Sequence, residues 1–226
     1  MAIRCVLFDF DGTLVDTAPE MADAVNDTLR RLGRPEASEA QVRSWIGHGA
    51  REMLAQALTE AGVGATAVAA NWPQFMQDYL ARCGTRSQPY PGVVPMLERL
   101  RQAGLSLALL TNKESAFAHR VLVKHGLTGY FDAIVAGDTL PVKKPHPDTI
   151  RHALESLGAH AEDTLYIGDS AVDVRTARAA GVEVWIVRHG YANELLEGAD
   201  APDRWLDDFD QLELRDAERL TIASAY

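Results

Sequence analysis

The chain has little cysteine and no excess of positive charge. Its 226 residues include two cysteines, Cys5 and Cys83, and neither lies in a CxxC or His-Cys spacing that would bind a metal. We therefore expect two free thiols and no disulfide. The formal net charge is −10. Because nucleic acids and anionic membranes bind basic surfaces, this charge argues against both as partners.

Long apolar runs are also missing. No stretch approaches the roughly 20 apolar residues that a membrane-spanning helix needs, and the N-terminus lacks the basic, apolar and small-residue regions of a signal peptide. These absences predict a cytoplasmic protein with no membrane partner. Hydrophobic residues still make up 47% of the chain, enough for one large domain or a core with a smaller insert. We expect a compact enzyme that is a monomer or a homodimer.

The most informative stretch lies near the N-terminus. Residues 5–8 form an apolar run typical of a buried strand, and two acids, Asp9 and Asp11, follow where that strand should end. Side chains alternate along a strand, so residues two apart point the same way and these carboxylates should converge on one spot. Gly12 and Thr13 then allow a sharp turn. Two acids at the end of a buried strand are costly unless they are functional.

Helical signals dominate residues 17–86. The segments that begin at Thr17 and Ser38 have the spacing of a capping box, with Glu20 and Gln41 three residues later. The expected helices cover residues 21–32, 39–46, 50–61 and 68–82. Because no strand pattern occurs in this region, the sequence predicts an all-helical insert.

From Tyr90 onward, helix and strand patterns alternate, which predicts a parallel sheet with crossover helices. The expected strands cover residues 105–110, 133–136, 165–167 and 184–187, and the expected helices cover residues 93–103, 115–125, 147–157 and 172–180. A short strand near Trp205 and a short helix near Leu212 complete the pattern. The predicted fold class is therefore α/β, with a parallel-sheet core in residues 1–16 and 87–226 and the helical insert in residues 17–86.

The polar residues that follow the predicted strands form one set. In an open parallel α/β sheet the reactive site lies outside the carboxyl ends of the strands. The residues at or near those ends are Asp9, Asp11, Thr111, Asn112, Lys144, Asp169 and Asp173. Magnesium binds through hard oxygen ligands, usually one or two carboxylates together with substrate phosphate. Acids, a hydroxyl, an amide and a cation together therefore predict phosphoryl transfer on a magnesium ion, with Asp9 and Asp169 as ligands.

The acids of the first strand and the lysine have distinct predicted roles. Asp9 is the expected nucleophile, because a carboxylate can form a covalent phospho-enzyme and so divide one difficult displacement into two. Asp11 is the expected general acid and base, since strand alternation places it near the same spot. Lys144 supplies a positive charge.

The remaining polar residues are expected to hold the phosphoryl group and the metal. Thr111 and Asn112 lie between a strand and a helix, where a hydroxyl and backbone amides can bind a phosphoryl oxygen. Asp169 and Asp173 are four residues apart at a strand-to-helix junction, so the helix can present both on one side. We expect Asp169 on the metal and Asp173 on a metal-bound water.

Four segments resemble, in the correct order, the motifs of the haloacid dehalogenase-like hydrolase superfamily. They are residues 9–16, Thr111-Asn112-Lys113, Lys144-Pro145-His146-Pro147 and residues 168–173. This resemblance covers nearly the whole chain, and it implies a Rossmann-like core with a helical cap inserted after the first strand. It also implies that the main-chain carbonyl of Asp11 reaches the metal. Lys144 is preferred to Lys143 because the superfamily places its lysine directly before the proline.

Within the superfamily, the chain resembles the bacterial phosphoglycolate phosphatases. Residues 45–50, Trp-Ile-Gly-His-Gly-Ala, are similar to the Trp-Ile-Gly-x-Gly-Ala pattern of that family, and Gly190-Tyr191 also looks like it. The resemblance implies a small-molecule phosphate ester as substrate, first of all 2-phosphoglycolate, hydrolysed with Mg²⁺ to glycolate and phosphate. The cap loop would close over the site, with His48 and Arg51 as candidate substrate residues and Arg51 paired with the substrate carboxylate.

Other functions stay open on the sequence. A phosphatase of another small or sugar phosphate and a sugar phosphomutase share all four motifs. A haloacid dehalogenase is disfavoured, because that relative lacks the second acid and the metal, whereas Asp11 and Asp169 are present. A non-enzymatic phospho-acceptor module resembling response-regulator receivers is a smaller domain, so it leaves the helical insert unexplained.

Overall fold

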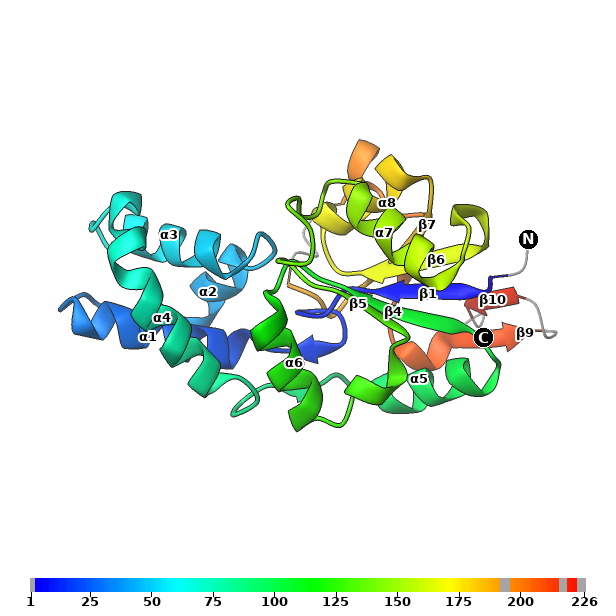
Figure 1. Cartoon of the computed structure of the whole chain (residues 1–226), viewed down its shortest axis with the longest axis horizontal. Helices are drawn as coiled ribbons and strands as arrows, with labels where there is room; N and C mark the ends of the chain where they lie inside the picture. Colours follow the sequence, from blue (N-terminus) through cyan, green and yellow to red (C-terminus); the bar gives the residue numbers. More distant parts are fainter. Residues whose placement is uncertain (1–2, 192–195, 216–218, 223–226) are drawn as a thin grey trace.

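The computed structural model describes residues 3–191, 196–215 and 219–222. A six-stranded parallel sheet with the strand order β5-β4-β1-β6-β7-β8 forms its centre (Figure 1). Its strands are β1 (Cys5–Phe8), β4 (Ser106–Leu110), β5 (Ala133–Val135), β6 (Thr164–Gly168), β7 (Glu183–Val187) and β8 (Arg204–Leu206). The predicted α/β class with a parallel sheet is confirmed.

The central strand β1 is buried on both sides. Because side chains alternate along a strand, Val6 and Phe8 pack into the hydrophobic cluster on one face of the sheet, and Cys5 and Leu7 pack into the cluster on the other. A strand with no polar position fits only in the middle of a sheet that is covered on both faces. Cys5 and Cys83 are both buried and free, as predicted.

Helices cover the two faces of the sheet (Figure 1). On one face lie α7 (Asp148–Leu157) and α8 (Ala171–Ala180), and on the other lie α5 (Val93–Gln102) and α6 (Ser115–Lys124). The predicted order of strands and helices after residue 90 is confirmed, with element ends displaced by one residue. The helix predicted near Leu212 is a 3₁₀ turn that ends at residue 211. Leu212 itself begins β9 (Leu212–Arg215), which pairs antiparallel with β10 (Arg219–Ile222).

Four helices form a separate group beyond the carboxyl ends of the sheet strands (Figure 1). They are α1 (Ala18–Arg31), α2 (Glu39–Trp45), α3 (Ala50–Glu60) and α4 (Val68–Arg82), and they confirm the predicted helical insert. Two short strands flank the group, β2 (Val15–Asp16) and β3 (Gln88–Pro89), and they pair antiparallel with each other. The chain therefore leaves the sheet-bearing part and returns to it at adjacent points. No helix in the part of the chain that the structure describes is long and apolar enough to cross a membrane.

One of the two predicted capping boxes forms. At the start of α2, the Ser38 hydroxyl accepts a hydrogen bond from the Gln41 backbone N–H at 3.2 Å. The Gln41 side chain in turn accepts one from the Ser38 backbone N–H at 2.9 Å. This reciprocal pair satisfies two donors that the first turn of a helix leaves free.

The capping box predicted at the start of α1 is wrong. The Thr17 hydroxyl donates to Asp11 Oδ1 at 2.6 Å, and the Glu20 carboxylate accepts from backbone N–H groups near the end of the insert. The Tyr191 hydroxyl takes the capping role, accepting from the N–H groups of Thr17 at 2.7 Å and Ala18 at 3.0 Å. Partners distant in sequence have thus replaced the local hydrogen bonds that the spacing predicts.

Candidate active site

The predicted residues of the sheet edge meet in one place. Asp9 and Asp11 follow β1, Thr111 and Asn112 follow β4, and Asp169 follows β6. All five residues line one cavity, which has a volume of about 30 Å³ and is also lined by Lys144. The helical insert closes the other side of the cavity through α1, α4 and the loop between α2 and α3. Residues of the sheet edge and of the insert therefore surround one small cavity.

Lys144 lies at the centre of the buried polar group. Its Nζ is 2.8 Å from Asp9 Oδ1 and 2.7 Å from Asp173 Oδ1, and it donates to the Tyr166 hydroxyl at 2.9 Å. Burial alone would lower the pKa of Lys144, but the charges of Asp173 and Asp9 outweigh burial and raise it well above the usual value. Lys144 is therefore a charged ammonium held directly against Asp9.

Asp173 has protein partners on both of its oxygens. Oδ2 accepts from the backbone N–H groups of Asp169 at 3.1 Å and Ser170 at 3.0 Å, and from the Ser170 hydroxyl at 2.7 Å. Oδ1 accepts from the Tyr166 hydroxyl at 2.7 Å as well as from Lys144. Burial favours the neutral acid, but Lys144 and these hydrogen bonds outweigh it and lower the pKa of Asp173. This carboxylate fixes Lys144 and the loop after β6, and its contact with a metal-bound water stays a prediction.

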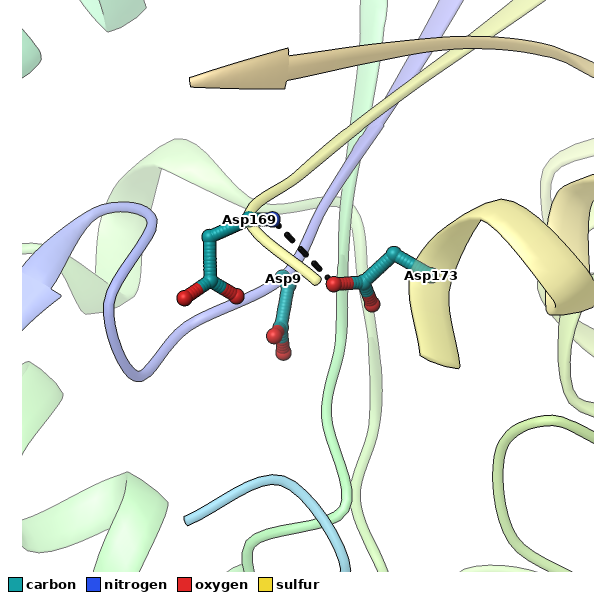
Figure 2. A group of neighbouring side chains, drawn as sticks. All are labelled: Asp9, Asp169 and Asp173. Carbon is teal, nitrogen blue, oxygen red and sulfur yellow. Dashed lines mark hydrogen bonds between the residues drawn. The ribbon is translucent and has the colours of Figure 1, made fainter. Parts of the chain in front are cut away.

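Three carboxylates converge at the strand ends (Figure 2). Asp9, Asp169 and Asp173 each place an oxygen within 4.8 Å of the other two. In the view of Figure 2, Asp9 lies between the other two acids, and its carboxylate and that of Asp169 point in the same direction. The Tyr191 backbone N–H donates to Asp169 Oδ2 at 2.7 Å and holds that side chain in place.

The charges of this cluster do not balance. Lys144 pairs with Asp9 and Asp173, so three carboxylates and one ammonium leave an excess of two negative charges. Burial, with a contribution from Asp173, raises the pKa of Asp9 to about 7 although Lys144 opposes the shift. Burial, with contributions from the charges of Asp173 and Asp9, raises the pKa of Asp169 well above its usual value. A divalent cation fits this set of hard oxygen donors and would supply the missing charge, and Asp9 and Asp169 are the acids that could hold it.

Asp11 lines the same cavity but has different partners. The Lys113 ammonium donates to both Asp11 oxygens, at 3.0 Å and 3.3 Å, and the Thr17 hydroxyl donates to Oδ1. Lys113 also donates to the Tyr79 hydroxyl on α4, so it connects the sheet edge with the helical insert. Burial would lower the pKa of Lys113, but the charge of Asp11 outweighs burial and raises it. The two acids after β1 therefore share a cavity, while Asp11 lies outside the cluster of three carboxylates.

Thr111 and Asn112 begin the loop after β4. The Thr111 hydroxyl accepts from the Lys113 backbone N–H at 3.1 Å at the wall of the cavity. The Asn112 side chain accepts from the Lys144 backbone N–H at 2.9 Å, and it donates to the carbonyl oxygens of Lys144 at 3.0 Å and Gly47 at 2.8 Å. Asn112 thus fixes the backbone of Lys144 and attaches the loop of the insert to it. Phosphate binding by Thr111 and Asn112 stays a prediction.

The loop between α2 and α3 covers the cavity, but the candidate substrate residues His48, in this loop, and Arg51, in the first turn of α3, lie outside the cavity wall. Gly47 and Gly49 line the cavity, and a Cβ on Gly49 would lie 3.1 Å from the Asn112 main-chain oxygen. His48 is exposed to solvent and is not part of the cavity wall. Arg51 is also exposed, with its guanidinium 5.4 Å from the centre of the Trp72 ring. The structure does not bring His48 or Arg51 to the other site residues.

Three residues of the site were missed by reasoning from the sequence. Lys113 lies inside the Thr-Asn-Lys segment, but its position after two polar residues gave no sign that its ammonium turns back to Asp11. Tyr166 lies between two apolar residues of a buried strand, and a buried hydroxyl needs a partner, which was a usable signal. Tyr191 follows Gly190, where an added Cβ would collide with the Asp169 side chain. Only glycine at that position lets the backbone approach Asp169.

The chain is similar to known proteins over most of its length. Residues 6–187 match the family model described as Haloacid dehalogenase-like hydrolase. The chain is 38% identical over 213 residues to phosphoglycolate phosphatase 1 of Pseudomonas aeruginosa. The aligned region covers 92% of this chain and 78% of that protein.

Solved structures agree in fold. A predicted phosphoglycolate phosphatase from Haemophilus somnus superimposes with a TM-score of 0.82 and 30% identity, over 92% of this chain and 96% of that one. CbbY from Rhodobacter sphaeroides, crystallised in complex with phosphate, superimposes with a TM-score of 0.79 and 27% identity, over 93% of this chain and 96% of that one. With its family model matched over the sheet and the insert alike, the protein is an enzyme that belongs to the haloacid dehalogenase-like hydrolase family.

Proposed function

We propose that this enzyme is a magnesium-dependent phosphatase that hydrolyses 2-phosphoglycolate to glycolate and phosphate through a covalent phospho-Asp9. The observation that carries the proposal is the setting of Asp9, a buried carboxylate at the end of β1 with Lys144 at 2.8 Å and Asp11 on the same cavity. The similarity to a protein named phosphoglycolate phosphatase supports the choice of substrate.

In the first step, an Asp9 oxygen bonds to phosphorus while the bond between phosphorus and the ester oxygen breaks. Asp11 gives a proton to the departing glycolate oxygen. Lys144 stabilises negative charge on Asp9 and on the phosphoryl group. Asp9, Asp169 and the main-chain carbonyl of Asp11 would hold the magnesium ion, which would supply positive charge against the repulsion between a carboxylate and a phosphate dianion.

In the second step, Asp11 acts in the opposite direction. As a carboxylate it takes a proton from a water molecule, whose oxygen attacks phosphorus and releases Asp9. The Thr17 hydroxyl and the Lys113 ammonium hold Asp11 at the cavity, so the same group can serve both steps. The Thr111 hydroxyl, at the wall of the cavity, is placed to bind a phosphoryl oxygen.

The helical insert acts in this proposal as a cap, formed by residues 17–86, over a catalytic core formed by residues 1–16 and 87–226. The pairing of β2 with β3 supports this division, because it brings both connections between the two parts side by side. Cap residues close the cavity, so the cap must move away from the core for substrate to enter.

The test is a panel of phosphate monoesters with and without Mg²⁺. We expect metal-dependent phosphate release, with the highest kcat/KM for 2-phosphoglycolate among 2-phosphoglycolate, sugar phosphates and p-nitrophenyl phosphate. Asp9→Asn should abolish release while the circular dichroism spectrum stays unchanged. Substantial activity in Asp9→Asn would contradict the nucleophile. Release from sugar phosphates alone would replace 2-phosphoglycolate as the substrate, and isomerisation of a sugar phosphate without release would indicate a phosphomutase.

A further inference from the structure

The proposed substrate carries a second charged group, and the site must bind it close to the phosphoryl group. In 2-phosphoglycolate only an ester oxygen and one methylene separate the phosphorus from the carboxylate. With phosphorus next to Asp9, the carboxylate therefore lies inside the same cavity. A residue that recognises it has to line that cavity.

Two positively charged side chains in the described part of the chain line the cavity, Lys144 and Lys113. Lys144 is held between Asp9 and Asp173 at 2.8 Å and 2.7 Å, which assigns it to the phosphoryl end of the site. Arg51, the residue expected from the sequence, is exposed and lies against Trp72 outside the cavity. Lys113, which pairs with Asp11 alone among the described acids of the cavity wall, is thus the second cation that can face an anionic group there.

The surroundings of Lys113 suit this role. Its side chain is 1% exposed, and its Nζ faces Asp11 from the core and the Tyr79 hydroxyl from the cap. Tyr79 also lines the cavity, and its ring lies against the Lys113 ammonium with Nζ 4.9 Å from the ring centre. Because the Tyr79 hydroxyl accepts from Lys113, its own proton is available to a carboxylate, and the ammonium can turn toward that carboxylate one of the two donors that it directs at Asp11.

We propose that Lys113, assisted by the Tyr79 hydroxyl, is the specificity residue that binds the carboxylate of the substrate. The inference rests on the proposed function and adds to it the residue that distinguishes a carboxylate-bearing ester from a neutral one. Because Lys113 belongs to the core and Tyr79 to α4, the carboxylate binds where cap and core meet. A substrate with this group therefore contacts both parts of the enzyme, and an ester without it loses that contact.

The test compares 2-phosphoglycolate with 2-hydroxyethyl phosphate, in which a hydroxymethyl group replaces the carboxylate. Lys113→Met removes the ammonium and keeps the length of the side chain. Any effect of this change on Asp11 lowers kcat/KM for both esters, so the ratio between them reports the carboxylate alone. A charge-assisted hydrogen bond in a buried site corresponds to a loss of about 10- to 100-fold. We expect the preference of the wild type for 2-phosphoglycolate to fall by that factor in Lys113→Met.

Two further variants complete the design. Tyr79→Phe removes one hydroxyl and should lower the preference several-fold, which tests the same site if Lys113→Met does not fold. Lys124→Met removes an exposed lysine of α6 and should leave the preference unchanged.

Equal losses for the two esters in Lys113→Met or, where that variant does not fold, in Tyr79→Phe would overturn the assignment. A collapse of the preference in Arg51→Ala but not in Lys113→Met would also overturn it. Both results would leave the phosphatase proposal standing if the wild type hydrolyses 2-phosphoglycolate. A wild type that hydrolyses neither ester would overturn both proposals.

Discussion

The Tyr191 hydroxyl is expected to stabilise the connection between core and cap. It accepts from the backbone N–H groups of Thr17 at 2.7 Å and Ala18 at 3.0 Å, and it donates to Asp16 Oδ1 at 2.8 Å. Thr17 and Ala18 are fully buried. In Tyr191→Phe the Ala18 N–H keeps a longer contact of 3.3 Å with Asp16, whereas the Thr17 N–H has no other acceptor among the described residues.

The expected cost follows from these partners. A buried donor left without an acceptor costs about 1–3 kcal/mol, and a lost hydrogen bond to a carboxylate adds about 1 kcal/mol. We therefore expect Tyr191→Phe to lower the free energy of unfolding by about 2–4 kcal/mol, measured by chemical denaturation. Tyr130→Phe is the matched control, because its hydroxyl donates to the exposed Glu98 at 3.2 Å. That change should stay within about 0.5 kcal/mol of the wild type.

A second measurement separates the hydroxyl from the backbone of the same residue. Asp169 is held by the N–H of Tyr191 and not by its side chain, so Tyr191→Phe should retain Mg²⁺ binding in titration calorimetry. If the two phenylalanine variants are equally stable, the hydroxyl does not cap α1 and the reasoning is refuted. A loss of Mg²⁺ affinity in Tyr191→Phe would show instead that the side chain positions Asp169.

Two further predictions concern the acids. Asp11→Asn should still form phospho-Asp9 from p-nitrophenyl phosphate but turn over about 10²- to 10⁴-fold more slowly, because no base activates water. Mass spectrometry of the quenched enzyme detects the intermediate. An unchanged steady-state rate would contradict the role of Asp11 as general acid and base. Burial raises the pKa of Asp9 from 3.8 to about 7, so the metal-free folded protein retains a proton that the unfolded chain releases near pH 4. The contribution of Asp9 to the stability of the metal-free protein is therefore lost as the pH rises from about 4 to about 7. Added Mg²⁺ should raise the unfolding temperature more at pH 8 than at pH 5, and equal shifts would place the ion elsewhere.

The sheet and the acids at its edge could be predicted because their signals are local. An apolar run that ends in Asp9 needs only the alternation of side chains and the rule that strand ends meet at one edge. The loop positions of Thr111, Asn112 and Asp169 follow from the same rule. At these positions the sequence pattern follows directly from the geometry of a parallel sheet, and in the structure all of these residues line one cavity.

The parts that could not be predicted depend on partners distant in sequence. The spacing of Thr17 and Glu20 is that of a capping box, but Asp11 and the backbone near residue 84 offer these side chains buried partners instead. Arg51 follows the cap loop in sequence, yet the first turn of α3 directs it to Trp72 and away from the cavity. The turn of Lys113 back to Asp11 likewise becomes visible only when β1 and β4 are seen side by side.

The pairing of β2 with β3 brings the two ends of the helical insert side by side. Val15 lies opposite Pro89 and Asp16 opposite Gln88, so the core meets the cap through two neighbouring strands, whatever the length of chain between them. The closure entropy of such a connection grows only slowly with the length of the inserted segment. A different cap could thus be grafted between residues 16 and 88 with the acids of the strand ends left in place. Such a graft would replace Thr17 and Tyr79, so the new insert would need its own partners for Asp11 and Lys113.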